Sequence, residues 1–440
     1  METKKTIRKS ISQSITVKAL VIAGIILVLL IPRVMIENLI KERQGRSVET
    51  IDKINEKWSD AQTLCGPVLA IPYTTTHVEK DNQYYSEHVL YITPENLEID
   101  TELSPEERYY GIYKTILYKS DTKIKGNFPA VSSIALENST LHFQKARMIM
   151  SISDLRGVDE QMLFKVNDRG FKSEAGNESA TWDKTLVAAL DETVFNHLDE
   201  GIAFECNLNL KGSKSMSFIP IGSNTKVQMT GDWNSPSFTG NFSPEYDYTD
   251  TGFTAKWSVL SFNRSIPEYW SDNRSFDFSD ARFGVNLIDQ VDHYQQNMRS
   301  VKYSLMFIVL TFVVFFFVEI IYKKRIHPIQ YLLVGVALIL FYSLLLSISE
   351  QLSFGISYLI SSVATILMIT LYAYSIFKNK TQTAILTVLL CLLYTFLYIT
   401  LQLEDIALLI GSIGLFIILG IIMYLSRKIK WYKDEDEASE

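Results

Sequence analysis

The chain has 440 residues, 47% of them hydrophobic, and its 42 basic and 49 acidic side chains leave a net charge of −7. An acidic balance argues against nucleic acid as a partner. The average conceals two different compositions, because residues 37–300 have a net charge of −13 whereas long apolar runs stand before and after them. A single soluble globule is therefore excluded.

The first apolar run covers residues 19–36 and follows a basic start, residues 1–18. Roughly 20 apolar residues of helix cross the ~30 Å apolar core of a bilayer. A basic start also precedes cleaved signal peptides, but no small-residue cleavage pattern accompanies this one, and Pro32-Arg33 and a polar stretch come instead. The pattern favours an uncleaved signal anchor with residues 1–18 in the cytoplasm.

Five further apolar runs follow one another closely toward the C-terminus. They cover residues 303–322, 329–348, 354–377, 382–401 and 406–426. Lys and Arg occur in the first and third links and after the last run, whereas the second and fourth links have neither. By the positive-inside rule, six spans with this pattern place both termini, including the tail 427–440, in the cytoplasm. The same rule places residues 37–301 outside it.

The long segment between the apolar runs predicts a large β-rich domain. After a polar, helix-forming stretch, short runs rich in Thr, Ser, Tyr and Phe alternate with Asn, Asp and Gly turns. Alternating apolar and polar side chains are typical of strands with one buried face. We expect an antiparallel, sandwich-like fold with one helix at residues 183–198, where apolar residues recur at helical spacing.

These elements define the expected fold class. It is an α+β membrane protein with an N-terminal signal-anchor helix, a large β-rich external domain and a C-terminal five-helix transmembrane bundle.

Several stretches match a known family in the same order along the chain. They include CGPVLAIPY at 65–73, SDLRG at 153–157, GDWNSPSF at 231–238, RFGV at 282–285 and HPIQYLLVG at 327–335. The chain resembles the CreD family of bacterial inner-membrane proteins, which is associated with cell-envelope integrity, stress response and colicin tolerance. The resemblance implies an inner-membrane location with residues 37–301 in the periplasm. It supplies no catalytic motif.

Two polar positions stand at the start of the span 329–348. His327 and Gln330 flank Pro328, and proline suits the first turn of a helix, where its missing N–H is no loss. Two interpretations fit His327 and Gln330: a helix start, or a recognition site in which His327 responds to pH. Glu319 lies one turn before Lys323, which predicts an i, i+4 ion pair at the interface.

Three carboxylates fall at the outer ends of spans. They are Glu350, Glu404 and Asp405. Ionisable residues at membrane depth are costly and often functional, but at a boundary they reach water. The alternatives are a structural role or a cluster that binds a cation, transfers protons or docks the external domain.

The remaining motifs argue against a bound cofactor. The six histidines are scattered, and the sequence has no zinc motif, phosphate-binding loop or dinucleotide fingerprint. We therefore expect no metal, nucleotide or other cofactor. Cys65 and Cys206 both lie in the external domain, where oxidation can join them in a disulfide.

Three functions are consistent with these observations. The leading hypothesis is a non-enzymatic role in envelope integrity or stress response, through an external binding surface held by the bundle. The second is a transporter or channel-like module, and the third is a membrane enzyme that acts on an envelope polymer or lipid. The expected partners are the lipid bilayer and an envelope component or protein. The acidic external domain favours cationic partners.

Overall fold

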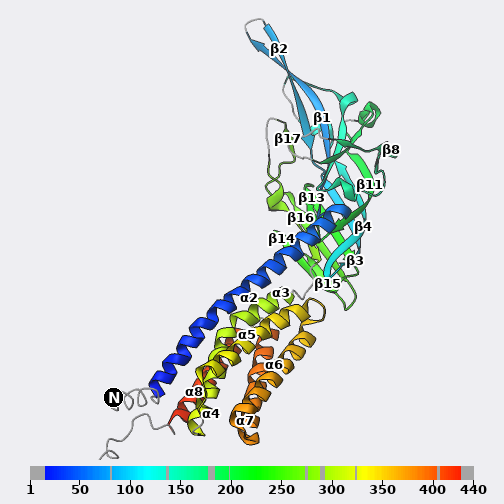
Figure 1. Cartoon of the computed structure of the whole chain (residues 1–440). Coiled ribbons are helices and arrows are strands. Elements are labelled where there is room, and N and C mark those ends of the chain that lie inside the picture. Colours follow the sequence, from blue (N-terminus) through cyan, green and yellow to red (C-terminus); the bar gives the residue numbers. More distant parts are fainter. Residues whose placement is uncertain are drawn as a thin grey trace, which may run out of the picture. The chain divides into compact units, whose positions relative to one another are not determined.

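The computed structural model describes residues 15–79, 82–134, 138–176, 184–197, 199–272, 276–287, 293–322, 325–403 and 407–427. The chain divides into two compact units. The helical unit comprises Met1–Ser47 and Val291–Glu440, and the β-rich unit comprises Val48–Gln290. Figure 1 shows the elements of both.

The helical unit consists of long apolar helices, which satisfy their backbone hydrogen bonds internally as a bilayer requires. Within the described residues, five helices are long and apolar enough to cross a membrane. They are α2 (Ile15–Trp58), α4 (Ser304–Ile321), α5 (Pro328–Ser349), α6 (Phe354–Phe377) and α7 (Lys380–Gln402). A short helix, α3 (His293–Lys302), precedes α4, and a further apolar helix is α8 (Ala407–Ser426). Together with the β-rich unit, they make the chain an α+β membrane protein.

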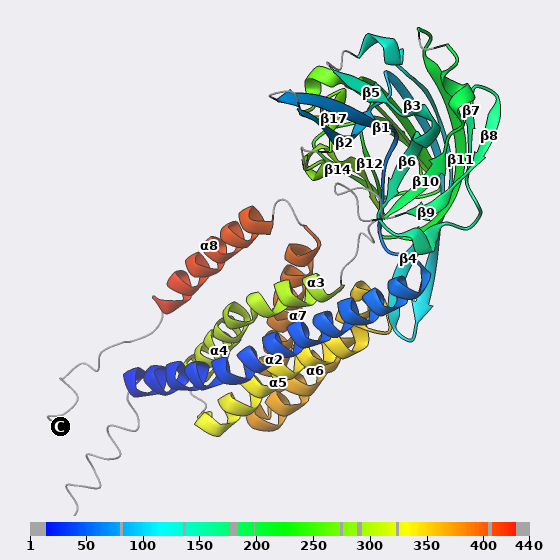
Figure 2. The same cartoon turned by 90° about the horizontal axis from the view of Figure 1, so that it is seen from above.

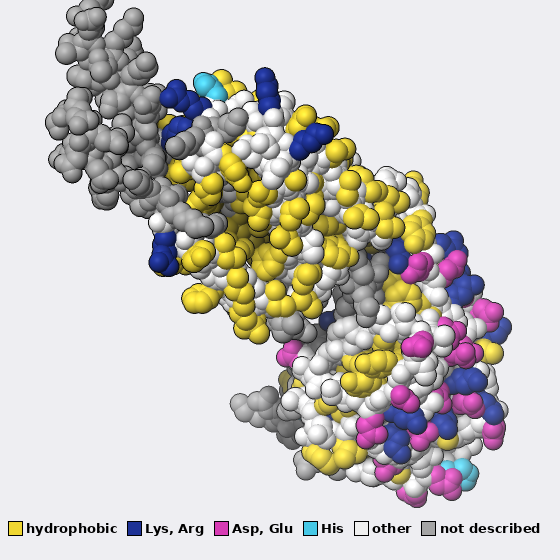
Figure 3. All heavy atoms as spheres, turned by 90° about the horizontal axis from the view of Figure 1, so that it is seen from below, with side chains coloured by type: hydrophobic (Ala, Val, Ile, Leu, Met, Phe, Trp, Pro, Cys, Tyr) yellow, Lys and Arg dark blue, Asp and Glu magenta, His cyan; other side chains and the backbone are white. Residues whose placement is uncertain are grey.

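Hydrophobic side chains cover much of the helical unit in the view of Figure 3, whereas charged side chains gather on the β-rich unit. Large apolar residues such as Leu333, Leu340 and Leu359 are more than half exposed. Exposed apolar side chains on helices of this length suit contact with lipid.

The part of α2 in the helical unit packs along the other helices through one stripe of side chains. Members of the stripe recur every three or four positions, which places them on one face of a helix. They are Lys18, Ile22, Ile25, Leu29, Arg33, Ile36, Ile40, Arg43 and Ser47. A Cβ added to Gly335 on α5 would stand 2.2 Å from Leu29 Cδ1, so the two helices are in close contact. Figure 2 shows α2 along the bundle.

The described strands of the β-rich unit form two sheets, of ten and eight strands. The ten-stranded sheet contains β1 (Gln62–Glu79), β2 (Asn82–Ile92), β5 (Ser139–Leu141), β6 (Arg147–Ile152), β9 (Glu174–Gly176), β10 (Thr185–Ala189), β12 (Ser215–Ile219), β14 (Pro236–Gly240), β17 (Tyr269–Ser271) and β18 (Phe283–Leu287). The eight-stranded sheet has the order β15 (Glu245–Tyr248), β16 (Phe253–Leu260), β13 (Asn224–Gly231), β3 (Asn96–Tyr110), β4 (Tyr113–Phe128), β11 (Ile202–Ser213), β7 (Leu163–Val166) and β8 (Arg169–Lys172). Among the described strand pairs, β1–β12 and β3–β13 are parallel and the others are antiparallel.

One apolar core joins the two sheets. Buried and exposed residues alternate along β11 and the first part of β3, so one face of the eight-stranded sheet is apolar. Residues of that face belong to the same buried cluster as residues of the ten-stranded sheet. The rings of Trp257 on β16 and Phe283 on β18 lie 5.3 Å apart and link the layers. This arrangement confirms the sandwich-like expectation.

The helix predicted at residues 183–198 is wrong. The described part of this segment contains strand β10 and a short 3₁₀ turn, Glu192–Phe195. β10 pairs with β6 and β9 on its two sides, and most of its side chains are buried. A short apolar run has the same composition in a buried strand and in a helix, and pairing with neighbouring strands decides between them.

Candidate functional site on the eight-stranded sheet

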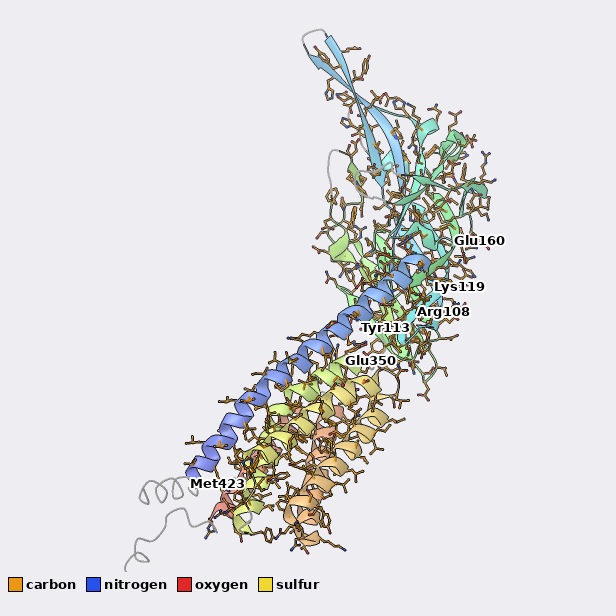
Figure 4. The ribbon with its side chains drawn as sticks, in the orientation of Figure 1. Arg108, Tyr113, Lys119, Glu160, Glu350 and Met423 are labelled. Carbon is orange, nitrogen blue, oxygen red and sulfur yellow. The ribbon has the colours of Figure 1, made fainter. Side chains whose placement is uncertain are left out.

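The face of the eight-stranded sheet that points away from the core is covered with charged side chains. This outer face follows from strand alternation, because every second residue of a strand points to the same side. Its exposed charges include Glu98, Asp100, Glu102, Lys119, Asp121, Lys123, Lys125, Lys165, Glu205, Lys226, Glu245, Asp247 and Lys256. Figure 4 labels Lys119 on β4.

The register of β3 and β4 determines which of these charges lie opposite each other. Glu98 is opposite Lys125, and their Oε2 and Nζ atoms are 3.0 Å apart. Glu102, by contrast, is opposite Asp121. Like charges directly opposite each other are unfavourable in a sheet, and a cationic ligand relieves such repulsion. The outer face therefore changes from mixed charge near Glu98 to acidic near Glu102.

Two neighbouring grooves hollow this face. The mixed groove, of about 680 Å³, is lined by carboxylates and lysines that include Asp100, Lys123 and Lys226. The acidic groove, of about 700 Å³, is lined by Glu102, Asp232, Glu245 and Asp247 together with Lys256, threonines and two tyrosines. Glu245 and Lys256 line both grooves. Volumes of this size suit a small ligand or an extended segment of polypeptide.

The C-terminal end of α2 is fastened to the β-rich unit by a polar network, the α2 anchor, formed by the buried residues Ser59, Gln62 and Asp154 and by the exposed Arg156. The Asp154 carboxylate accepts hydrogen bonds from Ser59 Oγ at 3.2 Å and from Arg156 Nε and Nη2 at 2.9 and 2.8 Å. Gln62 Nε2 donates to Ser59 Oγ and to the Asp154 carbonyl, both at 2.9 Å. Arg156 Nη1 donates to the Glu56 carbonyl at 2.5 Å, which satisfies an acceptor in the last turn of α2.

Opposing effects act on the pKa of Asp154. Burial raises the pKa. The hydrogen bonds from the Arg156 side chain and from the backbone N–H groups of Asp60 and Arg156 lower it, and together they outweigh burial, so the pKa lies well below its usual range. Asp154 is thus ionised at neutral pH at the end of α2. The paired guanidinium of Arg156 has its pKa raised by the same hydrogen bond.

Further contacts surround the α2 anchor. The Trp58 ring has Arg108 Cζ at 5.7 Å and Lys211 Nζ at 5.3 Å from its centroid, distances at which cations and aromatic rings attract each other. Thr115 Oγ1 on β4 donates to Asn55 Oδ1 at 3.0 Å. Figure 4 labels Arg108 and Tyr113, which lie toward the adjoining ends of β3 and β4. The last turns of α2 are therefore held by strands of the same sheet that presents the outer face.

The predicted carboxylate cluster can be described only at Glu350, because Glu404 and Asp405 lie outside the described residues. Glu350 ends α5 and accepts a hydrogen bond from Tyr294 Oη on α3 at 3.3 Å. Arg43 on α2 lies 3.9 Å away, and Asn297 Nδ2 donates to the adjacent Ser349 Oγ at 2.7 Å. Glu350 thus links three helices of the helical unit; Figure 4 labels its position.

His327 and Gln330 form a reciprocal cap at the start of α5. His327 Nδ1 accepts from the Ile329 N–H at 3.3 Å, and Gln330 Oε1 accepts from the His327 N–H at 2.9 Å. Together with Pro328 in the first turn, these bonds satisfy donors that a helix start leaves free. Both side chains have a structural task here, and the pH-responsive alternative remains a prediction.

Glu319 is 3% exposed and bonds to groups that its neighbours in sequence do not predict. Its carboxylate pairs with Lys18 on α2, accepts from Tyr331 Oη on α5 at 3.0 Å and accepts from the Ile326 N–H at 3.0 Å. Lys323, the partner predicted from spacing, lies outside the described residues.

The two cysteines of the β-rich unit lie in different sheets, Cys65 on β1 and Cys206 on β11. Cys206 is a free thiol in this structure, so the predicted disulfide to Cys65 is not formed in it. Both residues are buried, and burial, with a smaller effect of Glu205, raises the pKa of Cys206 to about 12. Among the described residues, no group of three His, Cys, Asp or Glu side chains is placed to hold a metal ion.

Comparison with known proteins decides the family. The family model described as Inner membrane protein CreD matches residues 14–432, nearly the whole chain. The chain belongs to the CreD family. The protein named Inner membrane protein CreD from Escherichia coli (strain K12) is 30% identical over 415 residues, which cover 93% of this chain and 92% of that protein. With five helices in the described part of the chain that are long and apolar enough to cross a membrane, this member of the CreD family is a multi-pass inner-membrane protein.

Two of the stretches that carried the resemblance to the CreD family lie at helix ends of this structure. Residues 153–157 supply Asp154 and Arg156 of the α2 anchor. Residues 327–335 supply the cap of α5 and Gly335, which contacts Leu29 of α2. The sequence contained Ser59, Gln62 and Lys18 as well, but no local pattern marked them, because they bind Asp154 or Glu319, which are 90 or more residues away.

Proposed function

We propose that this chain supports envelope integrity or the envelope stress response as a non-enzymatic inner-membrane protein that binds an envelope component on the outer face. In this proposal both termini are cytoplasmic and the β-rich unit is periplasmic. The spans are residues 19–36, 303–322, 329–348, 354–377, 382–401 and 406–426. The positive-inside pattern of the links supports this orientation.

The two adjoining grooves of the outer face are the observation that carries the proposal. Their charged side chains are exposed at the surface of the sheet, where they can meet a partner without a change of fold. A general acid or base usually needs burial or a close charged neighbour that adjusts its pKa. Exposed, solvated charges instead suit reversible electrostatic recognition.

The α2 anchor supports a link from binding to the membrane. α2 is one continuous helix of 44 residues that contributes to both units, and the anchor joins its last turn to β11 and to the segment before β7. A hydrogen-bonded anchor holds the last turn of α2 to the sheet more firmly than a flexible linker does.

Complementation tests the proposal. In a strain that lacks this protein, the full-length chain with Asp100→Lys and Glu245→Lys should accumulate in the membrane yet fail to restore resistance to detergent stress. The matched control, Glu87→Lys with Glu174→Lys, makes the same charge change at exposed positions of the ten-stranded sheet and should restore resistance. Full rescue by the groove variant would show that the outer face is not the functional surface.

Reporter fusions test the orientation separately. Periplasmic alkaline phosphatase fused after residue 440 should be inactive, and the same reporter inserted in the β-rich unit should be active. An active C-terminal fusion would refute a cytoplasmic C-terminus.

A further inference from the structure

The strand β15 is the terminal strand of the eight-stranded sheet. It pairs with β16 on one side, and no described strand pairs with its other side. All four of its side chains are exposed. Such an edge presents backbone N–H and C=O groups that can accept a further strand from another chain.

Strand alternation gives the two sides of β15 different chemistry. Glu245 is opposite Lys256 and Asp247 is opposite Thr254, and all four line the acidic groove. Tyr246 and Tyr248, which alternate with them, are opposite core residues of β16, so strand alternation directs their rings toward the other side of the strand, although both residues also contribute to the lining of the acidic groove.

The two tyrosines form an aromatic platform at the edge of the core. Their rings are 5.6 Å apart and nearly parallel, with an angle of 6° between the planes. Tyr246 also contacts Phe238 on β14, with ring centroids 4.9 Å apart. Nevertheless Tyr246 and Tyr248 remain 56% and 57% exposed. Large aromatic surfaces left exposed beside an unpaired edge favour a binding role.

Charge indicates which partner fits. Four carboxylates, Glu102, Asp232, Glu245 and Asp247, line the acidic groove against one lysine, Lys256. Asp121 on β4 adds a further negative charge opposite Glu102. A segment with positive side chains is attracted to this end of the outer face, whereas an anionic polymer or lipid head group is repelled.

We propose that the edge of β15 binds an extended cationic segment of an envelope polypeptide as an added strand. Its Lys or Arg side chains occupy every second position and face the acidic groove. The apolar or aromatic side chains between them pack on Tyr246 and Tyr248. The inference rests on the proposed function and specifies its partner class, since a strand added to an edge alternates its side chains with the same period of two.

Binding of synthetic peptides to the full-length chain in nanodiscs of neutral phosphatidylcholine tests this inference. The probe is a fluorescein-labelled octapeptide of alternating Lys and Val, measured by anisotropy with empty nanodiscs as the blank. The alternating peptide should bind at least about tenfold more tightly than a peptide of four Lys followed by four Val. Only in the alternating peptide do all Lys side chains lie on one face of the added strand and all Val side chains on the other. Two further probes have N-methyl groups on one or the other set of alternate amides. One of them should lose binding and the other should retain it, because only one set of N–H groups points to β15.

Variants of the chain locate the site. Asp247→Lys with Tyr248→Ala should weaken binding of the alternating peptide by about tenfold or more. The matched control, Glu87→Lys with Tyr84→Ala on β2, changes an equally exposed acid and tyrosine and should leave binding unchanged. Where the double variant has a lower melting temperature, Asp247→Lys alone gives the same test at an exposed position.

Equal binding of the block and alternating peptides, or of both N-methylated probes and the parent, would overturn strand addition. Unchanged affinity of the Asp247→Lys variant would do the same. If the peptide does not bind but Asp100→Lys with Glu245→Lys still abolishes envelope protection, this inference fails and the proposed function stands.

Discussion

Lys18 on α2 and Glu319 on α4 form an ion pair between residues 301 positions apart in the sequence. The carboxylate is buried, and it also receives the Tyr331 hydroxyl of α5 and the Ile326 N–H of the preceding link. One side chain therefore holds α2, α4 and the start of α5 together.

Replacement of Glu319 by Ala should destabilise the helical unit by about 2–4 kcal/mol, because Tyr331 Oη and the Ile326 N–H lose their acceptor while buried. Glu319→Gln keeps an acceptor and should cost less. Thermal unfolding of the full chain in detergent measures the loss of stability in both variants. The control is Glu42→Ala, which removes an exposed ion pair with Arg46 on α2. Equal melting temperatures for Glu319→Ala and the control would contradict this role.

The α2 anchor predicts a pH dependence of stability. The pKa of Asp154 in the folded chain lies below the value of about 3.9 typical of an unfolded chain. Its contribution is therefore fully present above that value and is lost as the pH falls further toward the folded pKa. Between pH 5 and pH 3 the wild-type chain should lose more stability than Asp154→Asn, measured by tryptophan fluorescence during thermal unfolding. Parallel losses in the two proteins would show that Asp154 does not contribute.

Gly157 follows the α2 anchor and has no room for a side chain. An added Cβ would stand 2.2 Å from the Lys211 carbonyl oxygen and 2.4 Å from Gln62 Nε2. Gly157→Ala should destabilise the β-rich unit by about 1–3 kcal/mol, since backbone must move. Gly170→Ala, where nothing lies within 4 Å of the added Cβ, is the matched control and should be nearly neutral. Denaturant unfolding followed by fluorescence compares the two.

Gly335 on α5 allows close contact with Leu29 on α2, because it has no side chain. Gly335→Val should force Leu29 away and lower the melting temperature in detergent, because an overpacked contact costs about 1–3 kcal/mol. A second change, Leu29→Ala, should restore part of the loss by making room. Gly24→Val introduces the same side chain on α2 where nothing lies within 4 Å and should have little effect. Absence of rescue in the double variant would argue against this contact.

Neutralising the three carboxylates predicted at the outer ends of the spans distinguishes a binding function from a transport function. The variant Glu350→Gln with Glu404→Gln and Asp405→Asn should preserve detergent resistance if function resides on the outer face, with at most about 1 kcal/mol of lost stability from the Tyr294 and Arg43 contacts. Loss of resistance at normal membrane levels would instead favour an ion-coupled role of the helical unit.

Much of the fold was predictable from local patterns. Hydropathy located the apolar helices because a bilayer-spanning helix is encoded in one continuous run. Alternation indicated a β-rich domain for a similar reason, since a strand such as β13, in which Lys226, Val227, Gln228 and Met229 alternate between exposed and buried, displays its period of two by itself. The same patterns gave the wrong prediction of a helix at residues 183–198. Leu186 and its neighbours are buried on both sides of β10, so this strand shows no alternation of apolar and polar residues.

The candidate site was less predictable than the fold. Glu350 and His327 stood out as polar residues at the ends of apolar runs, yet each contributes to helix ends and helix contacts in the structure. The acidic groove went unnoticed, because Glu102, Asp232 and Asp247 belong to three separate segments of the chain. No spacing rule connects residues that only strand pairing brings together.

The sequence alone determined the apolar spans, the basic links and the acidic β-rich region, because these are properties of consecutive residues. Tertiary structure decided that Asp154 and Arg156 hold the end of α2 and that β15 stands at the edge of its sheet beside Tyr246 and Tyr248. The physical reason is that strand order and buried ion pairs depend on which distant surfaces exclude water together, and this is a property of the folded chain.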